Sequence, residues 1–218
     1  MATVITAQDI AAMGATDLDE VLETVPGLHV ARSNLAYSPL YMIRGVASDF
    51  NPQVLMLQNG VPMTTLYVGS RGVVWAGLPV QNIARIEVIR GPGSALYGAD
   101  AYSGVINIIT KGPQDIDGTE LGLHAGSFNS RDAWVQHGGS VGPLALAAFL
   151  RIGRTDGAKG IVTSDAQTAL DGLFGTHASL APGPVNNGDH AVDGGLELDY
   201  GKWRLRAGYK QRSDVPGG

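Results

Sequence analysis

Two runs near the end of the chain alternate strictly between apolar and polar side chains, and this pattern constrains the fold more than any other. The run 196–200 alternates leucine or tyrosine with acidic residues. After the two-residue turn Gly201-Lys202, the run 203–210 alternates apolar or aromatic residues with cationic residues and one glycine. A period of two places one kind of side chain on each face of a β-strand. The runs therefore predict a hairpin with one apolar, aromatic face and one charged face.

This periodicity leaves two architectures open. In a soluble β-sandwich the apolar face would form the core, whereas in an outer-membrane barrel it would meet lipid and the polar face would line the lumen. Loop lengths favour the barrel, because the turns at Val141–Pro143 and Gly201-Lys202 are short while Asp156–Asp189 contains no predicted element. Outer-membrane barrels have short periplasmic turns and long external loops. Counting strands from Thr119, the long loop falls on the external side and both short turns fall on the periplasmic side.

The first half of the chain mixes helix and strand signals. Thr6 is placed to cap a helix that runs through Met13. Asp17 and Glu20 form a capping pair before a second helix, whose apolar face has the spacing i, i+3, i+4 and i+7. Asn59-Gly60 is the strongest hairpin turn signal in the chain. Short strands are expected at Leu28–Ala31, Tyr41–Arg44, Gln53–Leu57, Arg85–Arg90 and Val105–Thr110.

Composition excludes several functional classes. The 31 glycines are about twice the average usage of roughly 7% and indicate many tight turns between short strands. A net charge of -5 with scattered cations argues against a nucleic-acid binder. The chain has no cysteine, so it forms no disulfide or thiolate metal site. No run approaches the roughly 20 apolar residues of a membrane-spanning helix, and the first residues lack the pattern of a signal peptide.

The most specific feature is the segment 85–111, RIEVIRGPGSALYGADAYSGVINIITK. It closely resembles the plug signature of TonB-dependent outer-membrane receptors. Upstream segments keep the order of that family, namely VITAQDI, VPGLHV, MIRGV and VLMLQNGVPM. The resemblance covers about residues 3–112. Two positions depart from the usual pattern: Asn59 stands where aspartate is common, and Tyr102 where a smaller aliphatic residue is usual.

The resemblance implies an α+β plug domain, a small mixed sheet with short helices, over residues 1–112. It implies that residues 113–218 are antiparallel strands of an incomplete transmembrane β-barrel. Barrels in this family have about 22 strands, and the second half has room for about five. We therefore expect a receptor fragment whose barrel does not close. The TonB box, the segment gripped by the inner-membrane partner, finds no match before Val4.

Receptors of this family import scarce solutes, such as ferric siderophores, cobalamin or haem, across the outer membrane of Gram-negative bacteria. The resemblance thus implies a plug that gates the lumen, with TonB, outer-membrane lipid and a small-molecule or metal-chelate ligand as partners. It implies no enzymatic activity, no cofactor and no nucleic-acid partner. Tyr37, Tyr67, Arg71 and Trp75, on the loops 32–39 and 64–78, are the expected ligand contacts at the plug apices. Simple packing against barrel loops is the alternative for these four residues.

Two further groups of site residues follow from the signature. Its turn contains Gly91, Pro92, Gly93, Tyr97 and Gly98, where the glycines permit a sharp bend or positive φ and the proline fixes the bend. Arg44 and Arg90 each follow an apolar run and precede glycine. They are expected to reach acidic groups on the lumen wall, and exposed strand-end arginines are the alternative. The candidate plug–barrel contacts are therefore Arg44, Glu87, Arg90, Glu197 and Asp199.

Competing functions find less support. Gly91, Gly93 and Gly98 lack the spacing of a phosphate-binding loop and are not followed by Gly-Lys-Ser/Thr. The five histidines show no metal-ligand spacing, and no carboxylate pair or nucleophile elbow is present. A soluble plug-plus-β-sandwich binding module or adhesin, without transport activity, remains the alternative from another class. A receptor that also signals to a transcriptional regulator would need an additional N-terminal domain.

Overall fold

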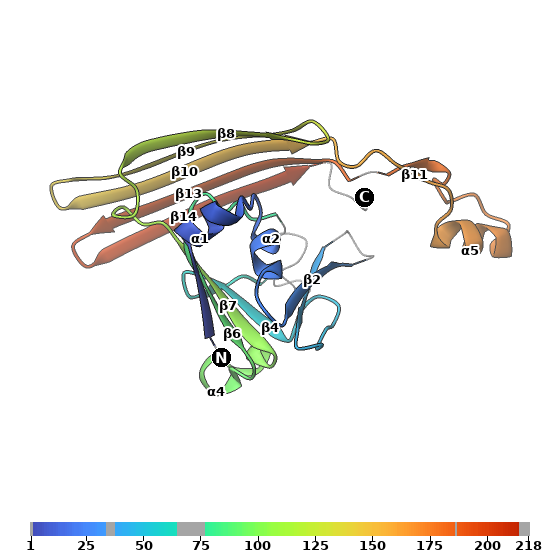
Figure 1. The fold of residues 1–218 in the computed structure, drawn as a ribbon, viewed down its shortest axis with the longest axis horizontal. Helices are drawn as coiled ribbons and strands as arrows, with labels where there is room; N and C mark the ends of the chain where they lie inside the picture. Colours follow the sequence, from blue (N-terminus) through green and yellow to red (C-terminus); the bar gives the residue numbers. More distant parts are fainter. Residues whose placement is uncertain (1, 34–37, 65–76, 186, 214–218) are drawn as a thin grey trace.

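The structure is a computed structural model and describes residues 2–33, 38–64, 77–185 and 187–213. It has two parts, a mixed α/β unit and a long, curved antiparallel sheet that lies along one side of it (Figure 1). We call the first part the plug and the second the wall sheet. No helix among the described residues is both long and apolar enough to cross a membrane.

A five-stranded mixed sheet forms the centre of the plug. Its strands lie in the order β1-β6-β7-β4-β5. Strand β7 lies in the middle, antiparallel to β6 and parallel to β4. Val105, Ile106 and Ile108 are buried, so the expected strand is present and is covered on both faces. The bounds are β1 Ala2–Thr6, β4 Val54–Gln58, β5 Val61–Pro62, β6 Ile83–Arg90 and β7 Gly104–Thr110.

Two short helices complete the plug core. Helix α1 (Ala7–Met13) has Thr6 and Asp9 in a capping box and ends at Gly14 in the left-handed conformation, as expected. Helix α2 (Leu18–Glu23) buries its apolar face in the core. The predicted capping pair differs in detail: the Asp17 side chain accepts from Asp19 N at 2.7 Å, whereas Glu20 accepts from Thr16 N at 2.8 Å. The two carboxylates therefore satisfy separate backbone donors.

The remaining plug elements lie close to their expected positions. Strands β2 (Leu28–Arg32) and β3 (Pro39–Ile43) form a separate hairpin. Asn59 and Gly60 both have positive φ, 52° and 80°, as the predicted two-residue turn between β4 and β5 requires. Between β6 and β7 lie the short helix α4 (Ser94–Tyr97) and the 3-10 turn η1 (Ala99–Ala101).

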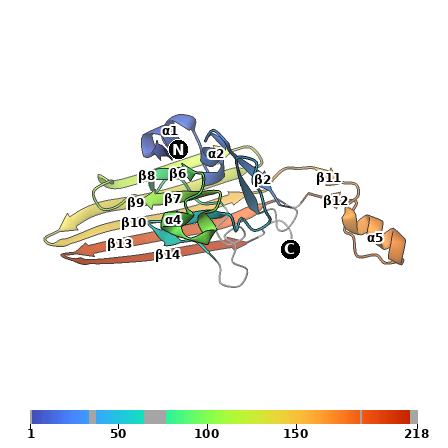
Figure 2. The same ribbon diagram turned by 90° about the horizontal axis from the view of Figure 1, so that it is seen from below.

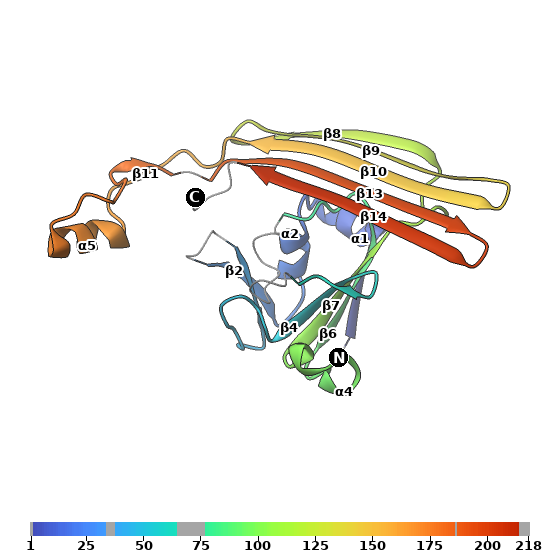
Figure 3. The ribbon, with the colours of Figure 1, turned by 180° about the vertical axis from the view of Figure 1, so that it is seen from behind.

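The wall sheet contains five long antiparallel strands in the order β14-β13-β10-β9-β8. The two-residue turns after β9 and β13 lie at one end, and the long β10–β13 connection lies at the other (Figure 3). That connection was expected to lack secondary structure, and this expectation is wrong. It contains α5 (Ala166–Phe174), capped by Asp165, and the strand pair β11 (Ile161–Val162) and β12 (Gly183–Pro184). The bounds of the long strands are β8 Gly118–Gly126, β9 Ser130–Val141, β10 Leu144–Thr155, β13 Asp189–Tyr200 and β14 Trp203–Ser213.

The plug lies against the charged face of the wall sheet, and Figure 2 shows the plug elements across these strands. Asp193 and Glu197, which alternate with leucine or glycine on β13, are buried on this inner face. The apolar side chains point the other way and are open, with Leu123 82%, Trp203 80% and Leu205 59% exposed. A soluble sandwich would bury that outer face under a second sheet. The arrangement is instead that of a membrane barrel wall.

Candidate functional site

A network of buried charges crosses four strands on the inner face of the wall sheet. Arg151 on β10 donates from Nε to Asp132 Oδ1 at 2.8 Å and from Nη1 to Asp193 Oδ2 at 3.1 Å. Lys210 on β14 donates to the other oxygen of Asp193 at 2.7 Å. The four side chains are only 7–13% exposed. Alternating signs across neighbouring strands compensate charges that would each be costly to bury alone.

Strands β13 and β14 carry further ion pairs toward both ends of the sheet. Arg206 Nε lies 2.5 Å from Glu197 Oε2, and Arg204 contacts both oxygens of Asp199 at 2.6 and 2.8 Å. At the opposite end of the same strand pair, Arg212 pairs with Asp189. The polar inner face is thus a continuous set of paired charges, as expected for the lining of an aqueous lumen.

The Gly77 carbonyl joins the plug to this charged lining. It accepts from Lys210 Nζ at 3.2 Å and from Arg212 Nη2 at 2.6 Å. Gly77 has φ +61°, and a Cβ at this position would fall on the Arg212 guanidinium. A glycine here therefore lets the cation approach the plug backbone closely. The carbonyl of Leu78, the residue after Gly77, accepts a hydrogen bond at 3.0 Å from Leu18 N, the first backbone amide of α2.

A second contact forms where the chain leaves the plug. The segment 112–117 between β7 and β8 lies against β9 at Gly138. A Cβ on Gly138 would lie 2.6 Å from Ile116 O and 3.0 Å from Pro113 O, both backbone atoms. The wall therefore carries a glycine where the connecting segment crosses it, and Ile116 is buried at the crossing.

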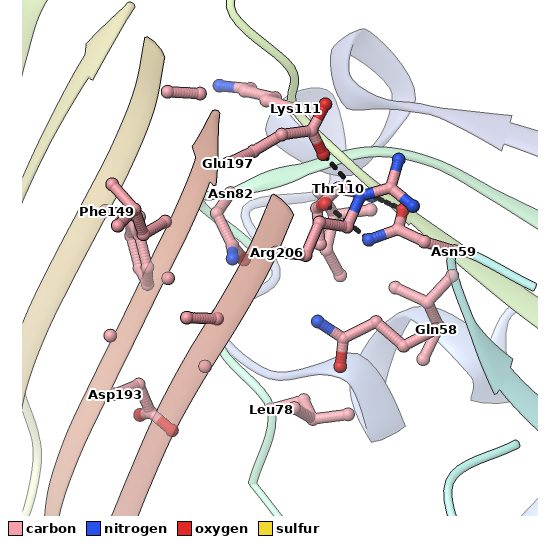
Figure 4. Close-up of a pocket in the computed structure, with 18 of the residues that line it drawn as sticks. Gln58, Asn59, Leu78, Asn82, Thr110, Lys111, Phe149, Asp193, Glu197 and Arg206 are labelled. Atoms are coloured by element: carbon pink, nitrogen blue, oxygen red, sulfur yellow. Dashed lines mark hydrogen bonds and ion pairs between the residues drawn. The ribbon is translucent and has the colours of Figure 1, made fainter. Parts of the chain in front are cut away.

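A cavity of about 390 Å³ lies between plug and wall sheet. On the plug side Asn59 accepts from Thr110 N at 3.0 Å and donates to Thr110 Oγ1 at 2.8 Å, which joins the hairpin turn to the end of β7. On the wall side Glu197 and Arg206 point into the same space (Figure 4). Among the described residues, no group of three or more histidine or acidic side chains is placed to hold a metal ion.

Comparison with known proteins agrees with this geometry. The sequence profile described as the TonB-dependent Receptor Plug Domain matches residues 1–105. The chain belongs to the TonB-dependent receptor family. The profile match falls on the plug, and the wall sheet matches the first barrel strands of such receptors. These are outer-membrane receptors of Gram-negative bacteria, and the family is not enzymatic.

Curated relatives of this TonB-dependent receptor include two kinds of protein. The vitamin B12 transporter BtuB of Vibrio vulnificus is 41% identical over 132 residues, which cover 60% of this chain and 21% of the relative. The pesticin receptor of Yersinia pestis is 33% identical over 186 residues, covering 82% of this chain and 25% of the relative. The chain thus spans about a quarter of the length of the curated relatives that it matches.

Solved structures share the fold along almost the whole chain. The siderophore receptor PirA from Pseudomonas aeruginosa aligns with a TM-score of 0.62 and 24% identity, covering 98% of this chain and 36% of PirA. The ferric yersiniabactin uptake receptor FyuA from Yersinia pestis aligns with a TM-score of 0.63 and 20% identity, covering 97% of this chain and 31% of FyuA. The open five-stranded sheet therefore corresponds to the start of a receptor barrel.

The residues predicted to join plug and barrel lie in two separate groups. Arg90 donates to Pro26 O and, at 3.0 Å, to Thr3 Oγ1, so both contacts are within the plug. Arg44 has φ 53°, and its Nη1 lies 3.4 Å from where a Cβ on Gly91 would be. The described contacts thus place both arginines at the same end of the plug, beside the Pro26 turn and the signature turn.

The three predicted acidic residues have cationic neighbours on their own sheets. Glu87 accepts from Arg85 at 2.8 Å and from Asn107 at 3.0 Å, and the Arg85 hydrogen bond lowers the pKa of Glu87. Glu197 and Asp199 pair with arginines of β14, as described above. In the described part of the chain, none of these carboxylates forms an ion pair with Arg44 or Arg90. The contacts that do join plug and wall, at Gly77 and Gly138, had no signal in the sequence that we recognised.

The signature turn adopts the conformations expected at two of its glycines. Gly91 and Gly98 have φ of 119° and 84°, which favours glycine. Gly93 differs, because its φ is not positive and its role is steric: a Cβ there would lie 3.0 Å from Val105 Cγ2. Pro92 lies between the two tight positions, and Tyr97 ends α4 half-exposed. The predicted ligand contacts Tyr37, Tyr67, Arg71 and Trp75 lie outside the described residues.

A buried acidic cluster lies where α2 meets the β2–β3 hairpin. Tyr41 OH donates to Asp19 Oδ1 at 2.8 Å, and Arg32 Nη1 lies 2.8 Å from Asp19 Oδ2. Burial and the neighbouring Asp19 carboxylate raise the pKa of Asp17 to about 7, while Arg32 and Arg212 act in the opposite direction. Arg212 belongs to the wall sheet, so the protonation of Asp17, the N-cap residue of α2, depends on a side chain of the wall.

The Asp17 carboxyl should therefore make the stability of the receptor depend on pH. Its folded pKa is raised above the unfolded value, so its contribution is complete below about pH 4 and is lost as pH rises through about 7. Asp17→Asn keeps an equally good helix cap and removes this titration. At pH 8 the variant should unfold a few degrees above the wild type, with on the order of 1 kcal/mol in its favour. Thermal unfolding in detergent from pH 4 to pH 8 measures the difference, and a difference constant across that range would contradict the assignment.

Proposed function

We propose that this chain forms the plug and the first part of the barrel wall of a receptor that actively takes up a scarce solute across the outer membrane. The observation that carries the proposal is the position of the plug on the charged inner face while the apolar outer face stays open. A plug in this position gates the lumen, and lipid covers the outer face. We place the boundary between plug and barrel wall at residues 112 and 113. TonB supplies the force through a segment N-terminal to the plug.

The substrate class proposed is a metal chelate or corrinoid. Support comes from relatives, whose names include vitamin B12 transporter, siderophore receptor and ferric yersiniabactin uptake receptor. Ferric siderophores, cobalamin and haem are therefore the first solutes to test. Cells that lack their own receptors and carry the complete receptor should accumulate one labelled member of this set in a TonB-dependent manner. Equal accumulation with and without TonB would contradict the proposal.

We assign ligand contact to Tyr37, Tyr67, Arg71 and Trp75. The support is the position of the described segments that flank their loops. The β2–β3 hairpin lies on the side of the plug nearer the long β10–β13 connection (Figure 1). Gly77 accepts from Arg212, which lies opposite the start of β13, where that connection ends. Long connections mark the external side of outer-membrane barrels. Aromatic rings supply rigid contact area and an arginine suits an anionic chelate. Alanine at these positions should weaken binding of the transported solute, whereas Leu96→Ala, an exposed position on α4, should not.

The predicted role of Arg44 and Arg90 in holding the plug within a complete barrel gives a separate test. Each would pair with an acidic group of the lumen wall, and removing one partner of a partly buried pair leaves the other charge uncompensated. Arg44→Ala and Arg90→Ala should therefore increase passive leakage of small antibiotics through the receptor severalfold. Arg85→Ala, which breaks a pair within the plug sheet, serves as the matched control. Leakage equal to that of the intact receptor would contradict the role.

A further inference from the structure

The outer face of the wall sheet has an apolar band that ends abruptly in a basic row. Cross-strand register places its side chains in rows that run across the sheet. At the end with the short turns the row is Val141, Leu144, Tyr200 and Trp203. Near the other end the row is Leu123, Ala133, Ile152, Val192 and, on the edge strand, Gln211. One step further, Arg131, Arg154 and His190 form the middle of the row, with Ala125 and Ser213 at its two edges.

The distance of the basic row from the short-turn end matches the height of the apolar band of an outer-membrane barrel, so the row lies at one boundary of that band. Arg154 is about 33 Å along β10 from Leu144 at a rise of about 3.3 Å per residue. With barrel strands tilted by about 40°, this separation corresponds to about 25 Å along the membrane normal, the typical height of the apolar band of such barrels. The long β10–β13 connection begins just beyond Arg154, which identifies this boundary as the external one.

The cross-strand pairing of Arg131 with Arg154 is unfavourable in the absence of an anion. Arg131 and Arg154 lie directly opposite one another in the β9–β10 register. Like charges directly opposite each other destabilise a sheet. Among the residues that the structure describes, no carboxylate lies within ion-pair distance of Arg131. Arg154 has one exposed partner, Asp156 Oδ1 at 3.3 Å, which leaves most of its five donors available.

We propose that Arg131 and Arg154 bind the phosphate of an anionic lipid headgroup in the outer leaflet. A phosphate between the two guanidinium groups replaces their repulsion with charge-assisted hydrogen bonds, for which arginine geometry is well suited. The acyl chains of the same lipid would lie along the apolar band below, against Ile152 and its neighbours. The rows thus match both parts of one phospholipid or phosphorylated glycolipid, which a free anion would not require.

The proposal is tested on the complete receptor in detergent, titrated with lipid A that carries two phosphates and with its dephosphorylated form. Native mass spectrometry measures bound lipid. The intact receptor should bind the phosphorylated form at least tenfold more tightly. Arg131→Gln combined with Arg154→Gln should lower that affinity roughly tenfold to thirtyfold, as expected for two cations at a membrane surface. Arg131→Lys combined with Arg154→Lys, which keeps both charges, should retain most of the affinity.

Lys202→Gln is the matched control, because it removes one exposed cation at the opposite end of the wall sheet. Its affinity should equal that of the intact receptor. Heat-modifiable migration on gels shows that each variant has a closed barrel. Equal affinity of the intact receptor for both lipid forms, or an unchanged affinity in the double glutamine variant, would overturn the proposal. Displacement of the lipid by millimolar inorganic phosphate would also overturn it, since it would identify the row as a simple anion site.

Discussion

Replacing Gly138 with valine is expected to force the segment 112–117 away from the barrel wall and to loosen the plug. A Cβ at this position would lie 2.6 Å from Ile116 O and 2.7 Å from Ile116 Cβ. Backbone atoms cannot rotate away as the end of a side chain can, so the segment itself must move. Inserting volume into a packed site costs about 1–3 kcal/mol, and the two methyl groups of valine should bring the effect to the upper end of that range.

The adjacent glycine provides the control for this experiment. Gly139 belongs to the outer face, and a Cβ there would meet only the ring of His137, at the ordinary distance of 3.5 Å. Gly139→Val should therefore leave the receptor close to wild type. We expect Gly138→Val to lower the unfolding temperature by several degrees and to expose the segment 112–117 to protease. If the two valine variants behave alike, the proposed close crossing at Gly138 is wrong.

Replacing Arg151 with methionine should have a larger effect still. Arg151 is the cation between Asp132 and Asp193, and its loss leaves Asp132 without its main partner on the inner face. Breaking a buried ion pair by removing one partner costs about 3–5 kcal/mol. Arg204 is the matched comparison, because its side chain is 54% exposed and its pair with Asp199 faces solvent. Exposed pairs contribute about 0–1 kcal/mol, so Arg204→Met should be close to neutral.

A third variant separates loss of charge pairing from loss of packing. Adding Asp132→Asn to Arg151→Met removes the uncompensated carboxylate and should recover a substantial part of the lost stability, while Asp193 keeps its pair with Lys210. Chemical unfolding of the complete receptor in detergent measures all three variants. Failure of this double variant to recover any stability would show that the methionine variant is destabilised by poor packing rather than by unpaired charge.

The parts of the fold that could be predicted from the sequence are those with local signals. The alternation in 196–210 predicted both faces of the β13–β14 hairpin, since side-chain direction in a strand follows from a period of two. Asn59-Gly60 predicted its turn because both residues tolerate positive φ. Helix α5 was missed because the length of the 156–189 connection was treated as the absence of structure. Its signal was present, since Asp165 and Thr168 have the spacing of a capping box at the start of the helix, which spans 166–174.

The contacts between plug and wall could not be predicted in this way. Lys210 and Arg212 reach the Gly77 carbonyl across 133 and 135 residues of sequence. The acceptor is a backbone oxygen, which has the same chemistry at every position, so no residue type marks it. Glu197 and Asp199 were correctly placed on a charged face. Their arginine partners on β14, however, are fixed by strand register rather than by any local pattern.

The order of strands in the plug sheet has a consequence for how the receptor is assembled. Among the strands that the structure describes, β1 pairs only with β6, so Thr3 meets Val88 and Thr6 meets Arg85. Closing this sheet brings together segments some eighty residues apart in the chain, and such long-range pairing is slow. The wall strands β9 and β10, in contrast, join through a two-residue turn, so their pairing is local and fast. We therefore expect the wall hairpins to form faster than the plug sheet, with their apolar face still uncovered.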